Sequence, residues 1–183
     1  VAFFGAALLF PQYFIGVRGE STLMAGLLVA PQGVGAMITM PIAGRMTDKI
    51  GPGKFVLTGI VLIAIGLGVF MFLGADTSYW LLGGALFVQG LGMGMSMMPM
   101  MSAALATLKA ESVADGSTLV NVVQQTAASI GTAVISVILA TNLKSLVPPT
   151  PSAAAGAFGD TFVVGVVLIA ICLVPAFFLP RKK

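Results

Sequence analysis

Long runs of apolar residues, separated by short polar stretches, dominate the chain. Six runs reach or approach the roughly 20 mostly apolar residues that a helix needs to cross the hydrocarbon core of a bilayer. We predict spans over residues 1–15, 23–44, 55–73, 79–108, 116–143 and 161–179. Backbone groups in lipid must pair internally, so unbroken apolar runs of this length are helices. The pattern therefore predicts an all-α integral membrane fold with six transmembrane helices.

The composition supports a membrane protein. Hydrophobic residues make up 58% of the 183 residues and charged residues only 8%, whereas soluble domains carry about 25% charged residues. So few charges could not cover a folded surface that faces water. The net charge of +3 is small and dispersed, which argues against nucleic acid as a partner and leaves membrane lipid as the expected surroundings.

The residue inventory excludes several kinds of chemistry. Histidine is absent and Cys172 is the single cysteine, so neither an internal disulfide nor a His/Cys metal site can form. All six carboxylates fall at or near the ends of the predicted spans. A Ser/His arrangement or a buried carboxylate pair therefore cannot be built, and we expect no enzyme, no cofactor and no metal. A mid-membrane acid for a proton relay is equally missing from these residues.

Basic residues are distributed unevenly between the two sides of the predicted spans. Two turns and the C-terminal tail hold seven of the nine, namely Arg45, Lys49, Lys54, Lys109, Arg181, Lys182 and Lys183. The opposite turns hold only Arg18 and Lys144. Because positive charge marks the cytoplasmic face, both ends are predicted to be cytoplasmic and residues 148–152 to form an external loop without secondary structure. The chain starts inside an apolar run without Met, which suggests a fragment of a longer protein.

The polar residues inside the runs follow a repeated order. The first, second, fourth and fifth runs carry polar side chains, while the third and sixth are almost purely apolar. This order suggests two three-helix repeats, a plan seen in some transporters, with the apolar helices at a lipid-facing rim.

Polar residues in the fifth run recur at intervals of 4, 4, 3 and 4, at Asn121, Gln125, Ser129, Thr132 and Ser136. At about 100° per residue they share one helix face. One or two such groups could simply hydrogen-bond a neighbouring helix. A stripe of five favours the wall of a polar cavity or a moving interface.

The fourth run contains two features that bear on packing. Gly90 and Gly94 form a GxxxG pair, which predicts close approach to a neighbouring helix. Pro99 is predicted to bend the helix. The methionines of this run either face lipid or form an adaptable apolar surface.

The turn predicted between the second and third runs reads GRMTDKIGPGK over residues 44–54. Its Gly44-x-x-x-Asp48-Lys49-x-Gly51 pattern resembles the G-x-L-x-D-R-x-G-R-K signature of the major facilitator superfamily, which in that family joins the second and third helices of a six-helix half. Pro52-Gly53 stands in place of the basic pair. Residues 13–59 and 116–133 are also similar to the second half of fourteen-span drug:proton antiporters.

The resemblance implies the C-terminal half of a proton-coupled multidrug exporter of a bacterial inner membrane, working by a rocker-switch. Its partners would be a missing N-terminal half of six or more helices, protons and amphipathic small molecules. The cavity would lie between the halves, and its candidate residues are Gln12, Tyr13, Gln89, Asn121, Gln124 and Gln125. The candidate gating residues are Gly44, Arg45, Asp48, Lys49 and Gly51, with Asp48 latching one half against the other. The alternatives are an exporter of one metabolite or natural product, and a membrane scaffold or self-dimerising module.

Overall fold

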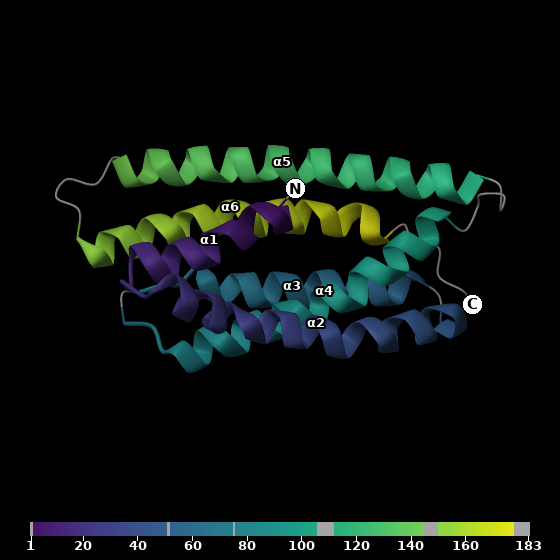
Figure 1. The fold of residues 1–183 in the computed structure, drawn as a ribbon, viewed down its shortest axis with the longest axis horizontal. Coiled ribbons are helices and arrows are strands. Elements are labelled where there is room, and N and C mark those ends of the chain that lie inside the picture. The colour runs from purple at the N-terminus through teal and green to yellow at the C-terminus, as the bar shows by residue number, and fades with distance from the viewer. Residues whose placement is uncertain (1, 51, 75, 106–111, 145–149, 178–183) are drawn as a thin grey trace.

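The computed structural model describes residues 2–50, 52–74, 76–105, 112–144 and 150–177. These residues form six helices and no strand, which confirms the all-α prediction. The helices are α1 (Ala2–Gly16), α2 (Thr22–Ile50), α3 (Pro52–Phe70), α4 (Tyr79–Leu105), α5 (Val113–Lys144) and α6 (Pro151–Phe177). They lie side by side along the long axis of the molecule, with α5 and α2 on opposite flanks (Figure 1). Among the described residues, all of these helices except the 15-residue α1 are long and apolar enough to cross a membrane.

Two helices extend further than the apolar pattern predicts. The turn expected from residue 44 is helical as far as Ile50, and α3 begins at Pro52. Proline suits the first position of a helix because its fixed φ is already helical and its missing N–H is not needed there. Polar residues can continue a helix beyond the lipid, so hydropathy alone misplaced this boundary.

The second extension is at α6, which begins ten residues before the predicted span. Thr150 caps the helix: its hydroxyl accepts a hydrogen bond from the N–H of Ala153 at 3.3 Å. Pro151 then occupies the first helical position. The expectation of an irregular loop is therefore wrong for Pro151 and Ser152, while residues 148 and 149 lie outside the described residues.

Helix α4 is packed tightly between α2 and α3, with glycines on both sides. A Cβ atom added at Gly94 or Gly90 would collide with α2 at Ala36 or Gln32, which confirms the close approach predicted from the GxxxG pair. Gly92 lies between them and faces the other way, where an added Cβ would stand 2.5 Å from the Gly59 carbonyl of α3.

Helix α1 occupies the corresponding position between α5 and α6. This reciprocal packing is what two three-helix repeats would produce, because the first helix of each repeat packs on the second and third helices of the other. Here aromatic rings fill the interface. Phe10 of α1 lies 4.7 Å from Phe70 of α3 and 5.3 Å from Phe162 of α6, measured between ring centroids.

The most apolar helices, α3 and α6, pack against each other, and the placement of their remaining surface at a lipid-facing rim stays a prediction. α3 and α6 meet at Phe70 and Phe162, whose ring centroids are 5.2 Å apart, while α2 and α5 are the most exposed of the five long helices. Apolar side chains pack as well in a bundle core as in lipid, so composition could not distinguish the two surroundings.

Candidate functional site

Three grooves lie between the helices, and two of them are each lined by one candidate cavity residue, Gln12 or Gln124. The first, of about 360 Å³, lies between α1, α5 and α6. Its polar side chain is that of Gln12, and its walls include Ile15, Leu139 and Phe158. Gln12 is thus one of the predicted cavity residues that the structure places in a groove.

The second groove, of about 450 Å³, lies between α1, α2 and α4. Small residues line most of it, and the larger contributions come from Val29, Gln32 and Met93. Gln32 was missing from the candidates chosen from the sequence. The sequence did contain a feature that could have identified Gln32. Its amide stands in the middle of an apolar run, where a polar group normally faces protein or water.

The third groove, of about 330 Å³, separates α4 from α5. Met100 and Met101 line one side, and Val123 and Gln124 line the other. Met93 and Met100 therefore both border grooves, which agrees with the adaptable-surface interpretation of the methionines.

The polar stripe of α5 lies beside the face that packs on α1. The packed face consists of Gly131, Ile135 and Leu139, and an added Cβ at Gly5 of α1 would stand 2.9 Å from the Gly131 carbonyl. Asn121 and Gln125 are exposed on the stripe.

No side chain of this stripe hydrogen-bonds another helix within the described residues. The hydroxyl of Ser129 donates to the Gln125 carbonyl of its own helix at 3.0 Å. The described part of the chain therefore does not use the stripe to bond helices together, which favours a cavity wall or an interface.

The other two cavity candidates are buried inside the bundle. Tyr13 has no exposed surface, and its hydroxyl donates to the carbonyl of Gly74 at 2.8 Å, so it ties α1 to the α3–α4 turn instead of lining a groove. Gln89 is also fully buried, but neither atom of its amide has a hydrogen-bond partner among the described residues.

The gating candidates lie at the far end of α2. Gly44 and Arg45 are exposed, and the backbones of Asp48 and Lys49 belong to the last turns of the helix. Gly51 lies outside the described residues. The structure therefore places the segment at the end of a helix and not in a free turn.

A polar cluster that the sequence analysis missed joins the α1–α2 turn to the α3–α4 turn. We call it the turn cluster and define it as Arg18, Glu20, Thr77 and Tyr79. Arg18 donates through Nε to the Tyr79 hydroxyl at 3.3 Å and through a terminal nitrogen to the Thr77 carbonyl at 3.0 Å. The Tyr79 hydroxyl donates to Glu20 at 2.5 Å, and the Arg18 guanidinium lies 4.4 Å from the Tyr79 ring centroid.

Local structure positions these groups. Gly19 takes a φ of 67°, which glycine adopts without strain, and Ser21 caps α2 by accepting a hydrogen bond from the N–H of Met24 at 3.2 Å.

The surroundings of Arg18 shift the pKa of its guanidinium in two opposite directions. Burial lowers the pKa, but the hydrogen bond to Tyr79 and the nearby Tyr79, Tyr13 and Asp76 groups outweigh that effect and leave the pKa above its usual value. Arg18 is thus held as a cation.

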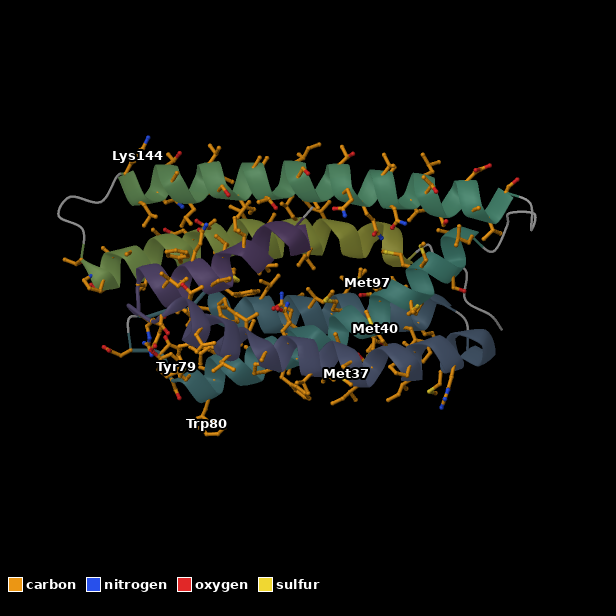
Figure 2. The ribbon with its side chains drawn as sticks, in the orientation of Figure 1. Met37, Met40, Tyr79, Trp80, Met97 and Lys144 are labelled. Carbon is orange, nitrogen blue, oxygen red and sulfur yellow. The ribbon has the colours of Figure 1, made fainter. Side chains whose placement is uncertain are left out.

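Aromatic and basic side chains gather at the same end of the bundle. Figure 2 shows Tyr79 there, and Trp80 pointing away from the helices with 92% of its side chain exposed. Lys144 lies at this end as well. Trp and Tyr favour the interface between lipid and water, so this end of the bundle has the character of a membrane boundary.

These features define a multi-pass α-helical membrane protein built from two reciprocal three-helix units, with open grooves between its helices. A family model described as Major Facilitator Superfamily matches residues 1–132. The match covers more than half of the chain, and the chain belongs to that superfamily.

Several bacterial relatives align with nearly the whole chain. The multidrug resistance protein B homolog of Mycobacterium tuberculosis (strain ATCC 25618 / H37Rv) is 40% identical over 216 aligned residues, covering 98% of this chain and 40% of the relative. The lincomycin resistance protein LmrB of Bacillus subtilis (strain 168) is 30% identical, covering 96% of this chain and 39% of the relative. The chain thus spans about two fifths of the length of these relatives.

Proposed function

We propose that this chain is the C-terminal six-helix half of a proton-coupled multidrug efflux transporter in a bacterial inner membrane. The names of the relatives, which refer to multidrug and lincomycin resistance, support the substrate class. The observation that carries the proposal is the exposed amide stripe of α5, whose side chains make no bond to another helix among the described residues.

The grooves have the chemistry that amphipathic substrates require. Their walls are apolar, and single neutral amides from Gln12, Gln32 and Gln124 supply donors and acceptors. A neutral amide binds a hydrogen-bonding group without selecting for charge, and methionine side chains adapt to different shapes. Broad recognition of drug-sized molecules follows from this combination, and transport, not catalysis, is the role that it serves.

Alternating access in this proposal is a rocking of this half against the other half. The α5 stripe, with Asn121 and Gln125, would border the passage between them. Asp48, at the end of α2, would latch the halves on the cytoplasmic side.

Replacing Asp48 with Asn tests the latch. The substitution removes one charge at nearly constant shape, so we expect slower efflux at unchanged expression. Unchanged efflux in membrane vesicles would remove the latch from the proposal.

Cysteine accessibility in the intact transporter tests the central claim. In a Cys172→Ala background, we expect Asn121→Cys and Gln125→Cys to react with a water-soluble maleimide, and an exported dye to slow the reaction. Ile130→Cys is the matched control, because Ile130 is exposed on the opposite face of α5 and should meet lipid. Equal reactivity at all three positions, or no reactivity on the stripe in any condition, would contradict a water-accessible passage.

An efflux assay separates this function from export of a single metabolite. We expect vesicles to transport several chemically unrelated dyes and antibiotics in a manner that depends on the proton gradient. Transport of one compound class only would favour a dedicated exporter.

A further inference from the structure

One polar side chain in the bundle core has no bonding partner among the described residues. Apart from Tyr13, three polar side chains are buried among the described residues. The Ser96 hydroxyl donates to the Gly92 carbonyl at 2.8 Å, and that of Thr161 to the Ala157 carbonyl at 2.7 Å. Gln89 is the third, and neither its amide nitrogen nor its amide oxygen has a hydrogen-bond partner in the described ranges.

Packing alone does not explain a glutamine at this position. A buried donor or acceptor without a partner destabilises the folded state, and a methionine of similar length would fill the same space without that cost. Helix α3 already approaches closely, since an added Cβ at Gly66 would stand 2.8 Å from the Cβ of Gln89. A buried polar group without a partner in a native structure requires a specific cause, and a partner met in another conformation is one such cause.

On α4, Gln89 lies close to residues that border the groove between α1, α2 and α4. Met93, which lines that groove, is four residues further on and therefore about 40° away on the same helix face. Gly90, the next residue, lies against the backbone of Gln32. The amide-bearing residues Gln32 of α2 and Gln89 of α4 thus lie at the same depth, and Ala7 of α1 lines the groove together with Met93 and Gln32.

We propose that Gln89 is a state-dependent binding residue of this groove, which pairs with an uncharged carbonyl or hydroxyl group of the transported molecule when α1 moves away from α4 near Ala7. The inference rests on the proposed transport function. The primary amide offers both a donor and an acceptor, so it suits a neutral hydrogen-bonding group carried on an apolar molecule. Helix α1 packs mainly on α5 and α6. Tyr13 ties its C-terminal end to the α3–α4 turn, so the movement that uncovers Gln89 would be a swing of the N-terminal part of α1, near Ala7, about that end.

The test compares Gln89→Met with wild type in the intact, purified transporter. The two probes are chloramphenicol, which carries amide and hydroxyl groups, and tetraphenylphosphonium, which has none. We expect Gln89→Met to keep or raise the ligand-free Tm. Chloramphenicol binding should weaken about tenfold, which is the effect of losing one hydrogen bond. Tetraphenylphosphonium binding should not change. Leu86→Met is the control, because Leu86 is fully buried one turn earlier on the same face.

Three results would overturn the inference: a lower ligand-free Tm in Gln89→Met, an equal loss of affinity for both probes, or the same loss in Leu86→Met. A ligand-independent measurement guards against probes that do not bind. In a Cys172→Ala background, Gln89→Cys should react slowly with a small water-soluble thiosulfonate, and no reaction in any condition would refute state-dependent exposure. If neither probe binds wild type while this cysteine reacts, the multidrug proposal fails and the exposure of Gln89 stands.

Discussion

The glycine contacts of α4 lead to a prediction with an internal control. Gly92 faces α3, and a Cβ atom at this position would stand 2.5 Å from the Gly59 carbonyl, 2.8 Å from the Ile63 nitrogen and 2.9 Å from the Ile63 Cγ1. Two of these atoms are backbone, so they can give way only if the helices separate. Gly84 of the same helix has nothing within 4 Å of the corresponding position.

The expected energies follow from this geometry. Ordinary carbon contacts begin near 3.5 Å, so Gly92→Ala must push α3 and α4 apart by up to about 1 Å. Overpacking of this kind costs about 1–3 kcal/mol, and replacing a helical glycine by alanine returns about 1 kcal/mol. We therefore expect Gly92→Ala to destabilise the protein by up to about 2 kcal/mol, and Gly84→Ala to stabilise it by up to about 1 kcal/mol.

The assay is thermal unfolding of the intact transporter in one detergent, for wild type and the two variants. Gly92→Ala should unfold below wild type and Gly84→Ala at or above it. The reasoning would be refuted if both variants shifted the transition in the same direction by the same amount. That result would mean that α3 and α4 are not in backbone contact at this depth.

Three further substitutions test other parts of the fold in the same unfolding assay. Tyr79→Phe removes the hydroxyl that binds both Arg18 and Glu20, and we expect a loss of about 1–3 kcal/mol; an unchanged Tm would show that the turn cluster contributes nothing to stability. Thr161→Val removes a buried hydroxyl that accepts a 3.2 Å bond from Asn142, so it should cost about 1–2 kcal/mol, with Thr161→Ser as the variant that retains the bond. Thr150→Ala removes the cap of α6 and should cost about 0.5–2 kcal/mol, whereas Thr150→Ser should restore it.

Much of the architecture followed from hydropathy, because lipid imposes one secondary structure on long apolar runs. The number of helices follows from the number of long apolar runs. The close approach at Gly90 and Gly94 and the exposed stripe of α5 follow from residue spacing along one helix. The end of α2 at Ile50 and the start of α6 at Pro151 did not follow. Helix ends outside lipid depend on caps and on polar helix formers, which hydropathy does not register.

The candidate site was predicted less completely, for a different physical reason. Spacing tells which residues share a face of their own helix, but not which neighbouring helix covers that face. Gln12 and Gln124 border grooves, whereas Tyr13 and Gln89 are enclosed. The turn cluster joins residues about 60 positions apart in sequence, and no local pattern could have paired them.

The two reciprocal units use different chemistry at equivalent positions, and this difference bears on movement. Glycines bring the backbones of α2 and α3 against α4, and such contacts cannot slide without steric collision. Around α1 one glycine, Gly5, stands against the α5 backbone at Gly131. The other contacts are mainly between aromatic and aliphatic side chains such as Phe10 and Phe162, which can change rotamer and repack. Two of the three candidate grooves lie where α1 or α5 meets the glycine-packed set. In the proposed transport cycle, movement of α5 or of the N-terminal part of α1 against the α2–α3–α4 unit would change the shape of those grooves.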